Sequence, residues 1–185
     1  KKILFVGEEI SFASRYRVEH FREQLHYQGY GSDFYQVDEV KDLDWNAYRA
    51  VVCYRCSREE VVRKVVEQAK KTGLNVYYDI DDLIFDYERI SYLHFLTGSE
   101  YKDFKKTTEQ IHSCMELCDG YFTSTDTLAG EIRREFPGKP VVINRNCASM
   151  EMQILSHDAV EQVEKDSEHI SIGYFSGSKT HDQDI

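Results

Sequence analysis

Short apolar segments alternate with amphipathic helical segments along this chain of 185 residues, and this alternation restricts the fold more than any other feature. The first apolar segment is Lys2–Gly7, and the strongest later ones are Ala50–Tyr54 and Leu74–Tyr78. Such runs of valine, isoleucine and aromatic residues are typical of strands that are buried on both faces. Weaker strand candidates are Ser32–Val37, Tyr121–Ser124 and Pro140–Ile143.

The segments between these strands have helical periodicity. Arg15–Gly29 repeats apolar residues at helical spacing, and so does the segment after Ser57, where Ser57 and Glu60 have the spacing of a capping box. Further helices are predicted over Tyr101–Leu117 and from Asp126, which is expected to cap its helix. Strands and helices that alternate throughout predict an α/β fold, with a Rossmann-like parallel sheet and helices on both faces.

Charge and hydropathy exclude several classes of protein. The net charge of -10 argues against a nucleic-acid partner, because phosphate binding needs lysine and arginine gathered on one face. Apolar runs such as Ile3–Val6 are much shorter than the roughly 20 residues that span a bilayer, so no transmembrane segment is predicted.

The five cysteines favour a reduced, cytoplasmic protein, because the count is odd and no leader precedes the first strand. Cys53 and Cys56, and likewise Cys114 and Cys118, have spacings that a zinc site can use. Cys53 also lies in a strand pattern, and the second pair lies on the apolar stripe of a helix. The sequence therefore predicts small buried core residues at these positions.

An acidic cluster, Asp79, Asp81 and Asp82, follows a predicted buried strand. Carboxylates this close repel one another unless a cation, an arginine or a proton relieves them. They can hold magnesium or manganese, or act as a general base toward a hydroxyl. Alternatively, one caps a turn and another pairs with an arginine, and Arg17 is a candidate for neutralising the cluster.

Other polar residues follow further strand ends, where ligands of parallel sheets bind. Arg15, Tyr16 and Arg17 come after the first strand and its loop, and they can bind carboxylate, phosphate or a ring, or form a solvated helical turn. Near the ends of later strands we single out Ser124, Thr125 and Asn144 as further candidate binding residues.

The last part of the chain differs from the rest. Residues 1–147 are predicted to form the domain described above, and residues 148–168 an acidic linker or helix. Residues 169–185 then have the strand, glycine loop and helix start of a second Rossmann-like unit, so we expect the chain to be part of a longer protein. The loop Ser176, Gly177, Ser178 and Lys179 can bring backbone N–H groups to a phosphate, or be an ordinary turn.

In their order, these motifs resemble the group 1 (family 4) glycosyltransferases of bacterial polysaccharide synthesis. The resemblance is carried by Ala13–Arg17, Tyr77–Asp86, Ser124-Thr125, Val142–Asn144 and Ile172–Asp182. It implies the N-terminal half of a two-domain GT-B architecture, in which a C-terminal domain holds the nucleotide-sugar donor. The N-terminal domain then holds a glycan or lipid-linked glycan acceptor.

The resemblance also implies residue roles. The catalytic candidates are Asp79, Asp81 and Asp82. Substrate is expected to be bound by Arg15, Tyr16, Arg17, Ser124, Thr125 and Asn144. The donor phosphates are expected to be approached by Ser176, Gly177, Ser178 and Lys179. Neither a metal nor a cofactor is implied, since the nucleotide-sugar is a co-substrate. The expected location is the cytoplasm, including the inner face of the membrane through the parent protein.

Two other functions fit the same residues. One is a non-catalytic flavodoxin-like or receiver-like binding module with an acidic pocket. The other is a metal-dependent GT-A transferase in which Asp79 and Asp81 form a metal-binding DxD motif. A need for manganese distinguishes the GT-A alternative, and a second Rossmann-like domain in the parent distinguishes the binding module.

Overall fold

A computed structural model describes residues 1–8, 10–90, 98–162 and 169. The described residues contain one six-stranded sheet in the order β2-β1-β3-β4-β5-β6, and all its pairings are parallel. The strands are β1 (Lys2–Gly7), β2 (Ser32–Gln36), β3 (Tyr48–Tyr54), β4 (Asn75–Asp79), β5 (Gly120–Thr123) and β6 (Val141–Ile143). The predicted Rossmann-like parallel sheet is confirmed, with strand ends displaced by one or two residues.

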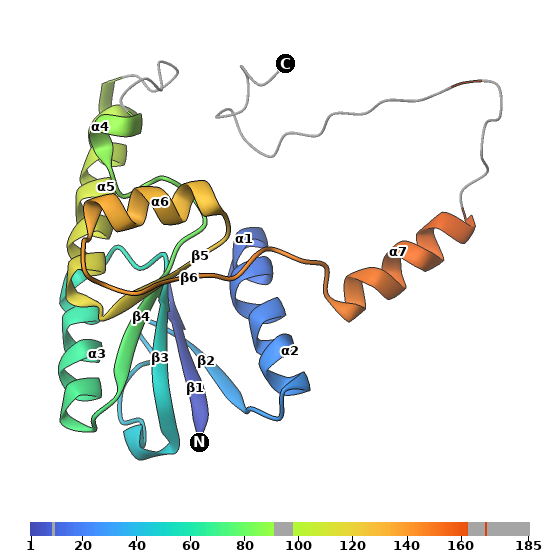
Figure 1. The fold of residues 1–185 in the computed structure, drawn as a ribbon, viewed down its shortest axis with the longest axis horizontal. Helices are drawn as coiled ribbons and strands as arrows, with labels where there is room; N and C mark the ends of the chain where they lie inside the picture. The colour runs from blue at the N-terminus through green and yellow to red at the C-terminus, as the bar shows by residue number, and fades with distance from the viewer. Residues whose placement is uncertain (9, 91–97, 163–168, 170–185) are drawn as a thin grey trace.

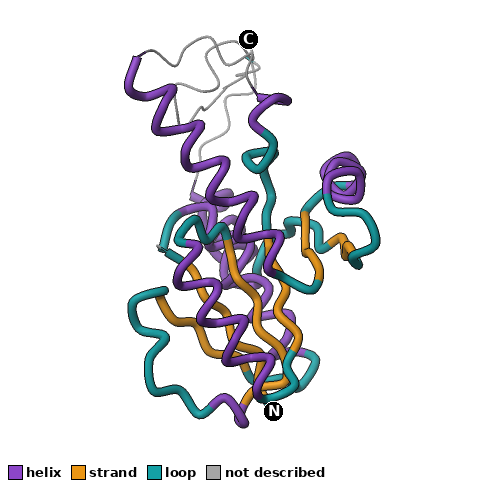
Figure 2. The backbone as a smooth tube through the Cα atoms, turned by 90° about the vertical axis from the view of Figure 1, so that its left-hand side faces the viewer, coloured by secondary structure: helices purple, strands orange, loops and turns teal. Residues whose placement is uncertain are grey.

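Helices cover both faces of the sheet (Figure 1). A continuous helical segment on one face consists of α1 (Phe12–Ser14), the π-helical turn η1 (Arg15–Glu19) and α2 (His20–Tyr27). The other face carries α3 (Glu59–Lys71), α5 (Gly98–Leu117) and α6 (Asp126–Glu135). The short helix α4 (Tyr87–Ile90) precedes α5, and α7 (Met150–Gln162) follows the last strand. Figure 2 shows the strands between these helical layers.

Strand periodicity divides the core into two hydrophobic clusters. In β3, Val51 and Cys53 face the larger cluster beneath α3, α5 and α6, whereas Val52 and Tyr54 face the smaller cluster beneath α2. The larger cluster also contains the other two predicted core cysteines, Cys114 and Cys118, and in addition Cys56, and all three are buried and free. The prediction that Cys53, Cys114 and Cys118 pack as small hydrophobic residues is confirmed.

Three local expectations about the helices are wrong. The first helix begins at Phe12 rather than Arg15, because Ser11 caps it in a reciprocal hydrogen-bond pair with Ser14. Thr125 rather than Asp126 caps α6, since the Thr125 side chain accepts a hydrogen bond from the Leu128 amide. Helix α3 has Arg58 at its N-cap position, without the predicted Ser57–Glu60 capping box.

The strict alternation of strands and helices is also interrupted once. Between β2 and β3 the described chain forms only a single 3-10 turn, η2 (Trp45–Ala47), whereas each of the other four crossovers contains α-helix. The segment 37–47 therefore crosses the sheet as an irregular connection beside α3.

Helix α7 forms within the predicted linker, and it buries none of its described side chains. It lies away from the body of the domain (Figure 1). The proposed donor-domain strand and its loop, including Ser176, Gly177, Ser178 and Lys179, lie outside the described residues. Within the described part of the chain, no helix has the length and apolar character needed to cross a membrane.

Gly120 allows β5 to approach the chain before β6, and an alanine there should be destabilising. Its Cβ would lie 2.8 Å from Pro140 Cγ and 2.9 Å from the Pro140 carbonyl oxygen. We expect Gly120→Ala to lower the free energy of unfolding by about 1–3 kcal/mol, the usual cost of overpacking, as measured by urea denaturation.

Gly130 in α6 provides the matched control. No atom lies within 4 Å of its hypothetical Cβ, and alanine is favoured over glycine inside a helix. Gly130→Ala should leave the stability unchanged or raise it by up to about 1 kcal/mol. Equal effects of the two substitutions would contradict this account of β5.

Candidate functional site

A buried ion pair lies beneath the carboxyl ends of the strands. Arg17, from the π-helical turn, donates from Nε to Asp79 Oδ1 at 2.8 Å and from Nη2 to Asp79 Oδ2 at 2.9 Å. Both residues are 0% exposed. Burial raises the pKa of Asp79 to about 6, and the Arg17 guanidinium opposes this shift. The proposed neutralisation of the acidic cluster by Arg17 is thus present at Asp79.

The same guanidinium holds the chain that follows β6. Arg17 Nη1 donates to the backbone carbonyl of Asn144 and, at 3.0 Å, to Asn146 Oδ1. Three residues further along the helical segment, His20 Nδ1 lies 2.8 Å from the Cys147 carbonyl oxygen. The buried arginine therefore connects the first helical segment, the end of β4 and the chain after β6.

The other two acidic residues share a second arginine. Arg55 follows β3, and its guanidinium contacts Asp81 Oδ1 at 2.7 Å and also pairs with Asp82. The Asp81 side chain is 11% exposed and that of Asp82 is 57% exposed, so this pair of carboxylates borders solvent. The backbone of Arg55 has a φ of +46°, which a non-glycine residue adopts rarely and at an energetic cost.

The N-terminus of α3 is capped from another strand. The Glu8 carboxylate, just after β1, accepts hydrogen bonds from the backbone amides of Ser57 and Arg58 and from the Ser57 hydroxyl. A negative charge at this position satisfies free helix amides and complements the helix dipole. Glu8 therefore occupies the place that an anionic ligand would take at a helix N-terminus.

Of these groups, Glu8, Arg55 and Ser57 border a cavity of about 270 Å³, which we call the crevice. It is lined by Glu8, Ser11, Tyr54, Arg55, Ser57, Ile84, Thr107 and Ile111. The crevice lies where the loops after β1 and β3 meet, and the direction of the strand order reverses there. Ligands of open parallel sheets bind at this kind of switch point.

Tyr54 gives the crevice an unusual polar group. Its side chain is only 4% exposed, and among the described residues its hydroxyl has no hydrogen-bond partner. Burial raises the pKa of Tyr54, and the nearby Asp81 carboxylate contributes further, so the hydroxyl keeps its proton and remains a donor. A buried donor without a partner is costly and can be satisfied by a ligand.

The remaining predicted site residues lie apart from the crevice lining. Arg15 is exposed on the helical segment, and Tyr16 packs edge-on against Phe12 and His20. Ser124 is 8% exposed, Thr125 caps α6, and the Asn144 carbonyl oxygen is bound by Arg17. These residues surround the ends of β1, β5 and β6 without lining the crevice.

Sequence reasoning did not single out Glu8, Tyr54 or Arg55 as site residues. Each does follow or end a predicted strand, and the rule that ligands bind at the carboxyl ends of strands places all three at the correct edge. The positive φ of Arg55 and the capping by Glu8 have no local sequence signal, because the first depends on the fold and the second joins residues 49 positions apart.

The fold and this site define an α/β domain with a six-stranded Rossmann-like parallel sheet and a polar crevice at its switch point. A comparison of the sequence with profiles of known protein families finds no match, and no curated protein matches it significantly.

Removing the buried arginine should make stability strongly dependent on pH. In Arg17→Met, Asp79 stays buried without a counter-charge, so its folded-state pKa should rise further above the unfolded value. A raised carboxyl pKa gives stability that is present at low pH and lost as the pH rises through the folded-state pKa. We expect a loss of about 3–5 kcal/mol at pH 7.5 and a clearly smaller loss at pH 5.

Two further variants make this test specific. The double variant Arg17→Met, Asp79→Leu should recover much of the loss, because no buried charge remains. Arg63→Met removes an exposed pair with Glu59 on α3 and should change stability by less than about 1 kcal/mol at either pH. A penalty for Arg17→Met that is the same at both pH values would contradict the assignment of a buried charge pair.

The acidic cluster should bind manganese poorly. Asp79 is engaged by Arg17, and Asp81 and Asp82 are both engaged by Arg55, so a metal ion would compete with guanidinium groups for every carboxylate. Calorimetric titration with Mn²⁺ should reveal no site tighter than about millimolar, the range of loosely organised carboxylates. A micromolar site that disappears in Asp81→Asn would instead support the metal-binding DxD motif.

Proposed function

We propose that this chain forms the acceptor-side domain of a nucleotide-sugar-dependent glycosyltransferase of the GT-B type. The observation that carries the proposal is the crevice, which offers carboxylate, hydroxyl and guanidinium groups beside the apolar side chains of Ile84 and Ile111. A sugar has both hydroxyl groups and apolar ring faces, so such a lining suits it. The Tyr54 hydroxyl, which has no hydrogen-bond partner among the described residues, is buried, so it can donate to a sugar oxygen only if its side chain moves toward the crevice.

Side chains of this chain already cap helix N-termini at the crevice, and this supports an acceptor role over a nucleotide-binding role. Diphosphates are commonly bound by free amides at helix N-termini. At the crevice, Glu8 already occupies the amides of Ser57 and Arg58, which lead into α3, and Ser11 caps α1. The diphosphate of a nucleotide-sugar therefore needs another binding surface, and the proposed donor loop at Ser176–Lys179 belongs to that second part.

Within this proposal the three aspartates differ in role. Asp79 is fully buried and positions Arg17, whereas Asp81 and Asp82 lie close enough to solvent to meet a substrate. We assign Asp81 or Asp82 the role of accepting the proton of the acceptor hydroxyl as its oxygen forms the new bond to the sugar. The bond from the sugar to the diphosphate breaks at the same centre, and its electron pair leaves with the nucleotide.

A binding module remains the second candidate, because the order of the first five strands is also that of flavodoxin-like and receiver-like sheets. Such a module would bind a phosphorylated ligand or Mg²⁺ at the same switch point. Calorimetric titration with flavin mononucleotide and with Mg²⁺ distinguishes it from a saccharide-binding domain.

The proposed function predicts that the crevice binds saccharides and not nucleotide-sugars. We expect some members of a panel of mono- and oligosaccharides to shift the amide NMR signals of Glu8, Arg55 and Ser57. The free nucleotide UDP, UDP-glucose and GDP-mannose should bind no more tightly than about millimolar, because Arg55, the one cation among the lining residues, is already engaged by Asp81 and Asp82.

Two variants test whether saccharides bind in the crevice. Arg55→Ala should weaken saccharide binding by at least about fivefold, the effect of losing a hydrogen bond to a charged group, whereas Arg63→Ala on the outer surface of α3 should not change it. If no saccharide affects these signals, or if UDP binds there with micromolar affinity, the acceptor-side assignment is wrong.

A further inference from the structure

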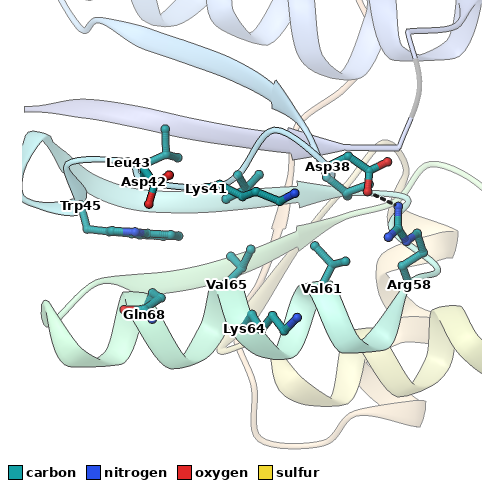
Figure 3. A pocket seen from close by; sticks show the side chains of 12 residues that line it. Asp38, Lys41, Asp42, Leu43, Trp45, Arg58, Val61, Lys64, Val65 and Gln68 are labelled. Atoms are coloured by element: carbon teal, nitrogen blue, oxygen red, sulfur yellow. Dashed lines mark hydrogen bonds and ion pairs between the residues drawn. The ribbon is translucent and has the colours of Figure 1, made fainter.

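The irregular connection between β2 and β3 leaves a second cavity open, which we call the groove. It lies between residues 37–45 and α3 and has a volume of about 620 Å³ (Figure 3). The other crossovers place an α-helix against the sheet, whereas this one places only the η2 turn beside α3. The volume falls within the range of roughly 300–1,000 Å³ that is usual for sites of small organic ligands.

Apolar side chains form the inner wall of the groove. Val37 and Val65 are 6% and 2% exposed, and Val61 lies one helical turn before Val65 on α3. Trp45, the only tryptophan of the chain, presents the flat surface of its indole from the opposite wall (Figure 3). Such a lining favours a slender or flat apolar body.

The groove is positively charged in an acidic protein. Its lining contains Lys41, Arg58 and Lys64 against Asp38 and Asp42, a formal charge of +1 in a chain of -10. The Arg58 charge is engaged by Asp38, with Nη1 and Oδ1 2.6 Å apart.

Lys41 and Lys64 are the two cations left for a ligand. Within the described residues, neither ammonium group has a hydrogen bond or an ion pair. They come from opposite walls, Lys41 from the β2–β3 connection and Lys64 from α3 (Figure 3). Glu60 and Glu67, one turn away on α3, do not line the groove.

We propose that the groove binds a small organic anion with an apolar body, such as an amphiphilic carboxylate. The anionic group lies near Lys41 and Lys64, and the apolar part packs on Trp45 and the valines of α3. A ligand with this charge gains from both lysines, whereas an uncharged one leaves them without a partner. The groove and the crevice share no lining residue, so this site goes beyond the proposed transferase function.

Trp45 provides a direct measurement, because it is the only tryptophan in the chain. We would titrate the full chain with decanoate and, separately, with decanol, and follow tryptophan fluorescence. Decanoate should give a saturable change and bind at least about tenfold more tightly than decanol, with an affinity that falls as salt is added. Absence of a saturable change, or equal affinities for the two compounds, overturns the proposal.

Substitutions in α3 locate the site. Lys64→Ala should weaken decanoate binding by about fivefold, the factor expected for one partly exposed charge pair, and Val61→Phe should weaken it by narrowing the groove beside Val65. Lys70→Ala is the matched control, because Lys70 is exposed on the same helix and does not line the groove. If Lys64→Ala binds decanoate as Lys70→Ala does, the proposed role of the lysines is wrong. Saccharide titration of the crevice is unaffected by either outcome.

Discussion

The buried pair of Arg17 and Asp79 is the interaction on which the arrangement of the site depends. It joins residues 62 positions apart and excludes both charges from water. Such a pair is stable only when its hydrogen bonds are well formed, since desolvation alone costs several kcal/mol for each ion. Arg17 meets this requirement with acceptors from Asp79, Asn144 and Asn146. Apolar side chains could fill the same space, but they would not fix the chain after β6 relative to β4.

The π-helical turn contributes to the position of that arginine. In η1 the His20 amide donates to the Arg15 carbonyl oxygen, five residues earlier, and the turn buries both Arg17 and Val18. Because a π-helical turn is wider than an α-helical turn, the side chains before and after it point in other directions than they would in a regular α-helix. Val18 joins the smaller hydrophobic cluster, and its neighbour Arg17 reaches Asp79 at the carboxyl end of the sheet. Irregular geometry thus places an ion pair beside an otherwise apolar interface.

The elements that could be predicted from the sequence are those with local causes. Strand runs and helical periodicity predicted all six strands and the main helices, and the polar strand ends indicated the edge of the sheet at which the crevice lies. The capping of α3 could not be predicted, because the local Ser57–Glu60 pattern was a valid candidate while the actual cap comes from Glu8, which follows β1. Only the folded sheet brings the ends of β1 and β3 together. For the same reason, the sequence suggested that Arg17 neutralises an aspartate but not that Arg55 binds Asp81 and Asp82.

The two cavities of the domain differ in the charged groups of their linings, and they therefore favour different ligands. Among the residues that line the crevice, Glu8 and Arg55 carry opposite charges, and the Arg55 charge is also engaged by Asp81 and Asp82 beside the crevice. A diphosphate would have to compete with these carboxylates for Arg55, whereas an uncharged polyol can donate its hydroxyl hydrogens to them. In the groove, Lys41 and Lys64, which have no ion pair with any described residue, favour an anion instead. Both properties follow from how the chain continues after each strand. After β3 it enters a helix with a capped N-terminus, and after β2 it forms a connection that contains no α-helix. The same parallel sheet therefore presents two cavities with different linings, for which we propose neutral, hydroxyl-rich ligands and amphiphilic anions respectively.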